Sequence, residues 1–161
     1  MKPKKILFIC LGNICRSPAA EGIMQQLVDE QGLSDHFLID SAAIGPWHIG
    51  DLPDSRMRRC GAKHGYTFNN RARQFSADDF DHFDLIIGMD HDNLRAIRSK
   101  ARSTADETKI HLMADYLRHH PNQSTIPDPY YGIERDFELV IELLEDACQG
   151  LLDELKTNTI Q

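Results

Sequence analysis

Short apolar runs alternate along this chain with longer segments in which apolar residues recur every three or four positions. The short runs predict four β-strands, at residues 5–10, 37–42, 84–89 and 109–113. Residues 5–10 and 84–89 are almost continuously apolar, which is typical of parallel strands that are covered on both faces.

Apolar residues at helical spacing predict helices between and after these strands. Residues 18–30 place their apolar side chains on one face, and Pro18 suits the first turn of a helix. Residues 54–64 and 93–101 are weaker helical segments. The clearest helical stripe lies near the C-terminus and consists of Phe137, Val140, Ile141, Leu144, Ala147, Cys148, Leu151 and Leu155.

Strands and helices in alternation predict an α/β fold with a parallel sheet. We expect a single domain over residues 1–161, in which a four-stranded parallel sheet carries helices on both faces. The proline- and glycine-containing segments 45–53 and 121–129 are expected to form long loops, and long loops in a compact domain are often functional.

Charge and cysteine content narrow the classes of function. The formal net charge of −7 gives no general attraction to nucleic acid or to an anionic membrane, and no apolar run approaches the length of about twenty residues that spans a bilayer. The cysteines Cys10, Cys15, Cys60 and Cys148 are too few for a disulfide scaffold and show no zinc-site spacing. We therefore expect a reducing, cytoplasmic location and neither a cofactor nor a metal. We also expect a monomer.

The most informative segment is CLGNICRSP at residues 10–18, which follows the first predicted strand and leads into the first predicted helix. Ligands of open α/β sheets bind at this kind of position, and a helix N-terminus offers unpaired N–H groups to an anion. Gly12 and Asn13 tolerate the backbone angles that a loop needs to turn several amides toward one point. The segment therefore predicts a phosphate-binding loop.

Cys10 and Arg16 lie at the two ends of this loop, with five residues between them. A thiolate is a good nucleophile, and the amides, the helix N-terminus and Arg16 favour the thiolate form of Cys10. The planar guanidinium of Arg16 can bind two phosphate oxygens at once, and Ser17 can add a hydrogen bond. A cysteine and an arginine at this spacing are common by chance, so the interpretation depends on the strand–loop–helix context.

Asp128 is the candidate general acid, in the sequence IPDPYYG at residues 126–132. Displacement of an alkoxide or phenoxide by a thiolate needs a proton donor, and the prolines on either side of Asp128 stiffen its loop. Tyr130 and Tyr131 can line the entrance and stack against an aromatic leaving group. Taken alone, the segment could also be a plain surface turn.

The string CLGNICRSP, together with DPYY at residues 128–131, resembles the signatures of the low-molecular-weight protein tyrosine phosphatases. The resemblance implies a cysteinyl-phosphate mechanism on tyrosine-phosphorylated proteins, with inorganic phosphate as a product. It implies that Cys10 is the nucleophile, Arg16 and the loop bind phosphate, and Asp128 is the acid. The substrate- and phosphate-binding residues are then Leu11, Gly12, Asn13, Ile14, Cys15, Ser17, Trp47, Tyr130 and Tyr131.

The resemblance also assigns residues around the loop. It supports a reversible, protective disulfide between Cys10 and Cys15, and this role is compatible with Cys15 being a small buried residue of the loop. Asp54 and Arg56 match a pair that orders a neighbouring loop. Asn70 departs from the pattern, because some family members carry a supporting histidine near this position.

Three alternative functions are consistent with parts of this pattern. Thiol-dependent arsenate reductases share the fold and the loop, but they use further cysteines in the middle of the chain, and none occurs here between Cys60 and Cys148. A phosphoarginine phosphatase would need a smaller, polar residue where Ile14 stands. A non-catalytic phosphate-binding module would be expected to lack the nucleophile, the arginine or the acid.

Overall fold

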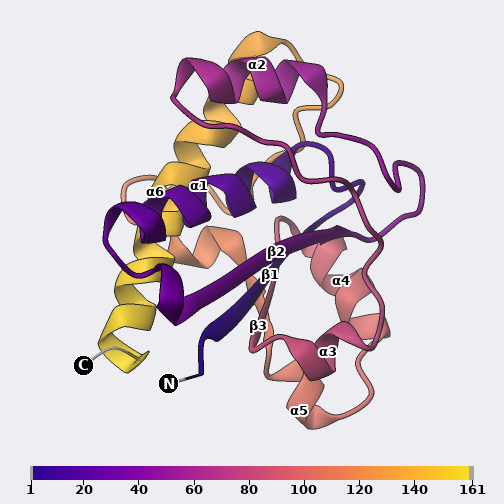
Figure 1. The fold of residues 1–161 in the computed structure, drawn as a ribbon. Coiled ribbons are helices and arrows are strands. Elements are labelled where there is room, and N and C mark those ends of the chain that lie inside the picture. The colour runs from indigo at the N-terminus through magenta and orange to yellow at the C-terminus, as the bar shows by residue number, and fades with distance from the viewer. Residues whose placement is uncertain (1, 160–161) are drawn as a thin grey trace.

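The computed structural model describes residues 2–159, so the outermost residues of the expected domain, 1 and 160–161, lie outside the described part. Its sheet contains β1 (Lys4–Cys10), β2 (Phe37–Ala43), β3 (Leu85–Gly88) and β4 (Ile110–Leu112) in the order β2-β1-β3-β4 (Figure 1). Every pairing is parallel. The predicted four-stranded parallel sheet is therefore confirmed.

Helices connect the strands. The α-helices are α1 (Arg16–Glu30), α2 (Ser55–Lys63), α3 (Asp79–His82), α4 (His91–Ser99), α5 (Thr104–Glu107) and α6 (Glu134–Thr159). Two 3₁₀ helices, η1 (Ser34–His36) and η2 (Met113–Tyr116), complete the described elements. The four-residue helices α3 and α5 were not predicted, because one turn is too short to show a helical period.

Most predicted elements differ from the observed ones by one or two residues at an end, and two of these shifts have a clear cause. The helix expected from residue 93 begins at His91, because Asp90 caps its first turn by accepting a hydrogen bond from the backbone N–H of Asn93 at 2.7 Å. The strand expected at residues 109–113 ends at Leu112, since Met113 already belongs to η2.

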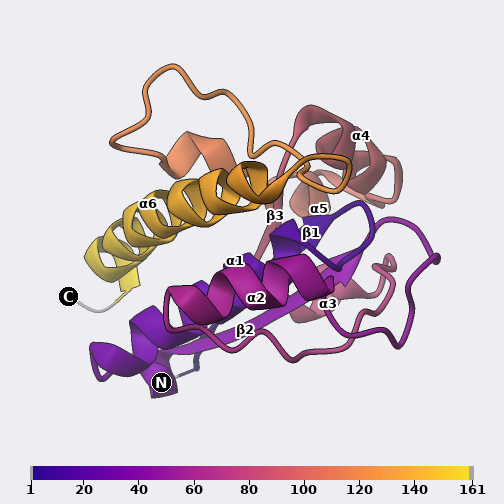
Figure 2. The same cartoon turned by 90° about the horizontal axis from the view of Figure 1, so that it is seen from above.

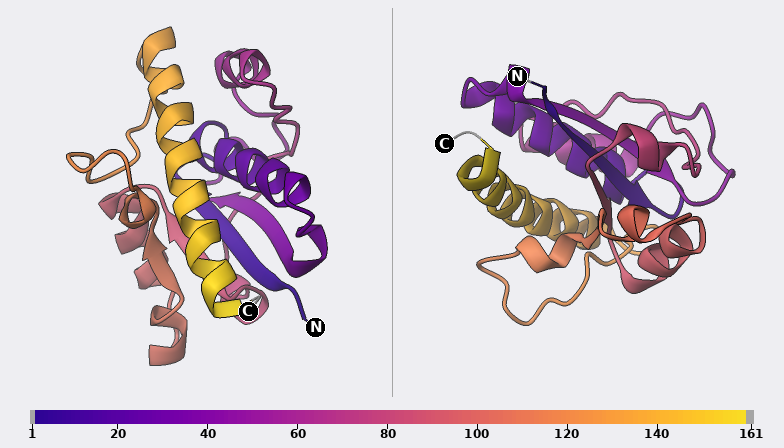
Figure 3. Two further views of the ribbon diagram at one scale, coloured as in Figure 1. Left: turned by 90° about the vertical axis from the view of Figure 1, so that its left-hand side faces the viewer. Right: turned by 90° about the horizontal axis from the view of Figure 1, so that it is seen from below.

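Alternate residues of β1 enter two separate cores, which shows why the strand is apolar on both faces. Ile6 and Phe8 pack into the core formed with α1 and α6, whereas Leu7 and Ile9 pack into the core formed with α3 and α4. Figures 2 and 3 show α6 running beside α1 on one face of the sheet, with α3, α4 and α5 gathered away from them. Helices therefore cover both faces, as predicted.

The apolar stripe of α6 is buried along its whole length, from Phe137 to Leu155. Cys148 lies within this stripe and is fully buried, which confirms that it is a core residue. On α1 and α2, glycines make room for Phe68: a Cβ atom at Gly22 or Gly61 would come within 2.6 Å or 2.4 Å of its ring. The aromatic ring thereby joins the two helices to the core.

The strand order places the functional end of the sheet at β1. The chain leaves β1 through α1 to reach β2 on one side, and later reaches β3 on the other side of β1. Crevices at such a reversal of strand order, outside the carboxyl ends of the strands, are the usual ligand sites of open α/β sheets. The loop after Cys10 lies at this position. None of the helices in residues 2–159 has the length and apolar character needed to cross a membrane.

Glu21 of α1 connects this helix to β2 beneath the loop. Its carboxylate accepts a hydrogen bond from the Ser41 hydroxyl at 2.6 Å. Burial raises the pKa of Glu21 to about 7, and the Ser41 hydrogen bond only partly opposes the shift. At pH 7 roughly half of the native molecules therefore keep a Glu21 proton that the unfolded chain releases near its ordinary pKa of about 4.3.

This shift predicts a pH-dependent stability. Between about pH 4.5 and 7 the native state binds the Glu21 proton more tightly than the unfolded state does, so the free energy of unfolding contributed by this group falls as the pH rises. Glu21→Gln keeps the oxygen that accepts from Ser41 but removes the ionisation. In chemical denaturation we expect the variant to be more stable than wild type by about 2 to 4 kcal/mol at pH 8, and by no more than about 1 kcal/mol at pH 5.

Glu30→Gln, on the exposed end of the same helix, is the matched control and should lack this pH-dependent gain. A Glu21→Gln variant that gains no stability between pH 5 and pH 8 would show that Glu21 is already ionised at little cost in the folded chain.

Candidate active site

The loop between β1 and α1 is built to receive an anion. Cys10 is the last residue of β1, and α1 begins at Arg16 with Cys15 as its N-cap. Cys15 makes no side-chain capping hydrogen bond, and the first turn of α1 carries no acidic residue. The N–H groups of that turn therefore point into the loop without a competing side-chain acceptor, and the helix dipole favours negative charge there.

Asn13 holds the curled backbone of the loop in place. Its φ of 57° lies in the left-handed region, where asparagine is among the few tolerated residues other than glycine. Its side-chain amide donates to the hydroxyls of Ser17 at 2.8 Å and Ser41 at 2.9 Å, and its carbonyl oxygen accepts from the Arg73 backbone N–H at 3.2 Å. Asn13 is thus held by hydrogen bonds to helix α1, to strand β2 and to the segment before α3.

Ser41 extends this support outward. Its hydroxyl accepts hydrogen bonds from the side-chain amides of Asn13 and Asn70, the latter at 3.0 Å, and donates to Glu21. Asn70, the departure from the expected pattern, therefore contributes to the support of Asn13 through Ser41. The support of the loop was not visible in the sequence, because its members are up to sixty residues apart.

Cys10 is only 3% exposed, and its sulfur lies 3.0 Å from the Ser17 hydroxyl. The backbone around it is fastened to the end of β2, since the carbonyls of Cys10 and Leu11 each accept a hydrogen bond of 3.0 Å from the N–H groups of Ile44 and Gly45. A hydroxyl at this distance can donate to a thiolate and stabilise its charge.

Arg16 is a buried cation with its partners already in place. One guanidinium nitrogen donates to the Asp90 carboxylate at 2.7 Å and to the Ile126 carbonyl at 2.9 Å, and the other lies 3.5 Å from Asp128. Burial opposes its charge, but the neighbouring Cys10, Asp90 and Asp128 outweigh that effect and raise the pKa of Arg16. The guanidinium is therefore charged and fixed beside Cys10.

Asp90 was missed by the sequence analysis. It follows β3, the strand next to β1, and one carboxylate oxygen caps α4 while the other binds Arg16. An acidic residue directly after a buried parallel strand was the available signal, because the carboxyl ends of neighbouring strands meet at one edge of the sheet.

A cavity of about 350 Å³ brings most of the predicted site residues together. Its lining consists of Cys10, Leu11, Gly12, Ile14, Cys15, Arg16, Trp47, His48, Asp128, Tyr130 and Tyr131. Asn13 and Ser17 are buried behind this surface and act on it through hydrogen bonds. His48 was not predicted, because a lone histidine in a loop carries no motif.

Aromatic side chains form the outer wall of the cavity. Trp47 is 66% exposed, and its ring packs against Gly45 so closely that a Cβ there would lie 1.8 Å from it. The rings of Tyr130 and Tyr131 meet edge to face at 4.9 Å, and Tyr131 is 96% exposed. Exposed aromatic rings at the edge of a cavity offer apolar contact to a planar ligand.

Asp54 and Arg56 form the predicted ion pair, with guanidinium–carboxylate distances of 3.0 Å and 2.9 Å. The Asp54 backbone N–H also donates to the Ile14 carbonyl at 2.8 Å, and Arg56 donates to the Tyr130 carbonyl at 3.0 Å. The pair therefore connects the phosphate loop to the loop that carries Asp128.

All four cysteines are buried free thiols. Burial, with a smaller contribution from the Asp54 charge, raises the pKa of Cys15 well above its usual range, so Cys15 stays a neutral thiol beside Cys10. The two cysteines next to the anion site therefore lie in different surroundings: a hydroxyl and a guanidinium face Cys10, whereas Cys15 is desolvated next to a carboxylate.

The cavity can accommodate a phosphate with a sulfur nucleophile behind it and a carboxyl group in front. Loop amides, the start of α1 and Arg16 supply the positive side. Within residues 2–159, one group of potential metal ligands has its donor atoms within mutual reach, namely Cys60, His64 and Glu138, and none of these three lines the cavity.

The chain matches a known family over nearly its whole length. Residues 5–161 match the family model described as low molecular weight phosphotyrosine protein phosphatase. The low molecular weight phosphotyrosine protein phosphatase of Gallus gallus is 44% identical over 151 residues, covering 93% of this chain and 94% of that one.

Solved structures share the fold. A protein tyrosine phosphatase from Entamoeba histolytica superposes with a TM-score of 0.93 at 39% identity, covering 96% of this chain and 98% of that one. A Drosophila arginine phosphatase superposes with a TM-score of 0.87 at 33% identity, covering 94% and 98%. With nearly full coverage in sequence and structure, this chain belongs to the low molecular weight phosphotyrosine protein phosphatases, a family of hydrolases.

Proposed function

We propose that the chain hydrolyses phosphotyrosine in proteins through a cysteinyl-phosphate intermediate, with Cys10 as nucleophile, Arg16 as phosphate ligand and Asp128 as general acid. The observation that carries this proposal is that the three side chains face one cavity, with Asp128 3.5 Å from Arg16 and Arg16 fixed beside Cys10. Family membership supports phosphotyrosine-containing proteins as the substrate class.

In the first displacement the Cys10 thiolate attacks phosphorus, and the bond from phosphorus to the tyrosine oxygen breaks. The loop amides and Arg16 bind the phosphoryl oxygens and stabilise the charge of the transition state. Asp128 gives its proton to the leaving oxygen. In this step Asp128 acts in its protonated form, as a general acid.

In the second displacement water attacks the cysteinyl phosphate and the sulfur–phosphorus bond breaks. Asp128, now a carboxylate, accepts the proton of the water, and inorganic phosphate leaves. The Ser17 hydroxyl, 3.0 Å from Cys10 Sγ, stabilises the departing thiolate. The residues of the chain supply every proton transfer, so the proposed mechanism needs no cofactor or metal.

The walls of the cavity favour an aryl phosphate over the alternatives. Ile14, Trp47 and Tyr130 present apolar or aromatic surface to the leaving group. The Drosophila relative shows that the fold also serves an arginine phosphatase, but Ile14 offers no polar atom to a guanidinium. An arsenate reductase would need further thiols near the cavity, and Cys60 and Cys148 do not line it. A binding module without catalysis would not need Cys10, Arg16 and Asp128 together, and all three line this cavity.

We further propose that residues 1–161 form one phosphatase domain that acts as a cytoplasmic monomer. Four free thiols suit a reducing compartment, and the net charge of −7 gives no reason for nucleic-acid or membrane binding. The proximity of Cys10 and Cys15 in one loop supports a reversible disulfide that protects the nucleophile from irreversible oxidation.

Replacement of Cys10 tests the nucleophile. We expect Cys10→Ser to lower the turnover of p-nitrophenyl phosphate by at least about a thousandfold, because a serine hydroxyl is not ionised at neutral pH. Wild type should keep its turnover in EDTA. Cys148→Ala, which removes a buried cysteine far from the cavity, should stay active. Turnover that survives in Cys10→Ser would place the nucleophile elsewhere.

Replacement of Asp128 tests the acid. We expect Asp128→Ala to lower kcat by about 10²- to 10⁴-fold, with a larger loss on phenyl phosphate than on p-nitrophenyl phosphate, because the more basic leaving group depends more on the proton.

Asp115→Asn, which changes an exposed carboxylate of η2, is the control and should leave the leaving-group sensitivity unchanged. Equal losses on the two esters in Asp128→Ala would show that this carboxyl only positions the loop.

A further inference from the structure

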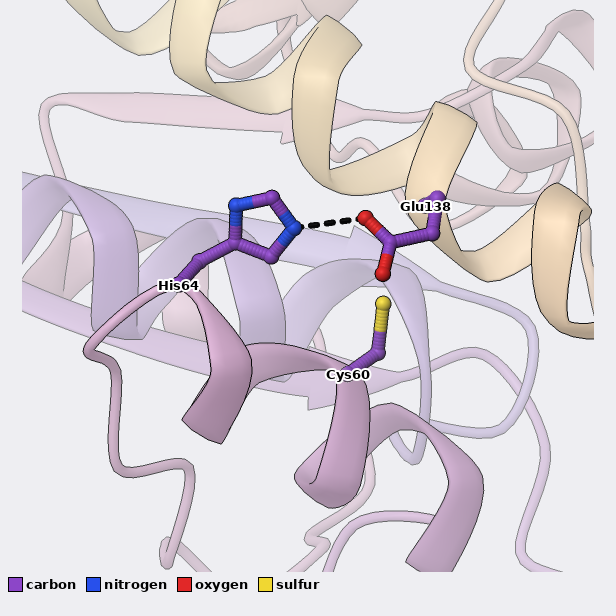
Figure 4. A group of neighbouring side chains, drawn as sticks. All are labelled: Cys60, His64 and Glu138. Carbon is purple, nitrogen blue, oxygen red and sulfur yellow. Dashed lines mark hydrogen bonds and ion pairs between the residues drawn. The ribbon is translucent and has the colours of Figure 1, made fainter.

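Cys60, His64 and Glu138 bring three different metal-ligating groups together outside the active-site cavity (Figure 4). Cys60 lies in α2, His64 directly follows the last residue of α2, and Glu138 lies in the first turns of α6. In Figure 4 the sulfur of Cys60 points toward one oxygen of Glu138, while the imidazole of His64 reaches the other. None of these side chains takes part in the proposed phosphatase chemistry.

The spacing along α2 suits chelation. Residues four apart on a helix lie on one face, so Cys60 and His64 present their ligand atoms to the same point. Glu138 approaches this point from the neighbouring helix, with its oxygen 2.5 Å from His64 Nε2. Two ligands from one helical face and a third from a packed helix form a rigid arrangement.

The distances fit a small tetrahedral ion after minor side-chain rotation. The sulfur, nitrogen and oxygen atoms all lie within 4.8 Å of one another. Zinc binds cysteine sulfur at about 2.3 Å and nitrogen or oxygen at about 2.0 to 2.2 Å, which places neighbouring ligands of a tetrahedron about 3.3 to 3.8 Å apart. In the metal-bound state, the ion would lie between His64 and Glu138 and take the place of their direct hydrogen bond.

The surroundings of the cluster are mixed in charge. Glu138 supplies a carboxylate, and Glu134 and Glu142 lie in the two adjoining hollows, which Arg59 and Arg135 also line. Coordination removes the proton of a thiol outright, and that proton passes to the solvent. Lys63, next to the cluster, is already paired with Glu134.

The cluster is accessible from solvent. Cys60 is itself only 2% exposed, but it lines a surface hollow of about 270 Å³ together with Arg56, Arg59 and Glu134. His64 and Glu138 line a second hollow, which also contains the acidic residue Glu142. Their side chains are 34% and 37% exposed. An ion can therefore enter without unfolding, and water can supply a fourth ligand.

We propose that Cys60, His64 and Glu138 form a binding site for Zn²⁺ that joins α2 to α6. A thiolate, an imidazole and a carboxylate select zinc over magnesium or calcium, which prefer oxygen ligands alone. The site lies apart from Cys10 and supplies nothing to the proposed catalytic steps. A bound ion would stabilise the packing of α2 against α6.

Metal titration of the full chain carrying Cys10→Ser and Cys15→Ser tests the proposal, because this parent lacks the two active-site thiols that could bind metal. Co²⁺ serves as a spectroscopic probe. We expect one equivalent to bind with a thiolate-to-cobalt charge-transfer band in the near ultraviolet, and Zn²⁺ to displace it. Zn²⁺ should also raise the Tm of the parent.

Variants of the parent assign the ligands. Cys60→Ser should abolish the charge-transfer band. His64→Gln and Glu138→Gln should weaken binding by at least about tenfold, since even the partners of metal ligands contribute that much affinity. His82→Gln, which removes an exposed histidine of α3, is the matched control and should bind as the parent does. Circular dichroism without metal shows whether each variant is folded.

Three results would overturn the proposal. The parent could show no thiolate band, the band could survive Cys60→Ser, or His64→Gln could bind Zn²⁺ as tightly as the parent. Cys60 is buried and its variant could lose stability, but His64 and Glu138 are partly exposed, so their variants decide the question even then.

Discussion

The site depends on one backbone conformation, the left-handed turn at Asn13. Such a conformation costs a residue other than glycine on the order of 1 to 2 kcal/mol. Here the buried hydrogen bonds to Ser17, Ser41 and the backbone of Arg73 offset that cost. Without this turn, the amides after Cys10 could not face the same point as the first turn of α1.

The second constraint is a buried positive charge. Arg16 is 2% exposed, and its buried charge is balanced by Asp90 and Asp128 in the absence of a phosphate. Asp90 is fixed, because its other oxygen caps α4. The Asp128 side chain is 40% exposed and lies in a loop, so a phosphate can replace it as the ion-pair partner of Arg16. One carboxylate thus orients the arginine, while the other is available for proton transfer.

Contacts at the start of α2 connect the loop after β1 to the loop that carries Asp128. The Asp54 backbone holds Ile14, and Arg56 holds the carbonyl of Tyr130 while its guanidinium lies over the ring of Phe137, 4.7 Å from the centroid. The proposed zinc ligands lie at the opposite end of the same helix. A metal there would restrain α2 against α6 at the end where fewer hydrogen bonds to the active-site loops exist.

The sequence by itself determined the strands and the longer helices, and it located the loop that we propose to bind phosphate. It did so because periodicity and the string at residues 10–18 are local properties. Only the tertiary structure decided that Asp90 pairs with Arg16, that Ser41 and Asn70 support Asn13, and that Cys60 and His64 meet Glu138. These contacts join residues far apart in the chain, and their geometry exists only after the strands are ordered and the helices are packed.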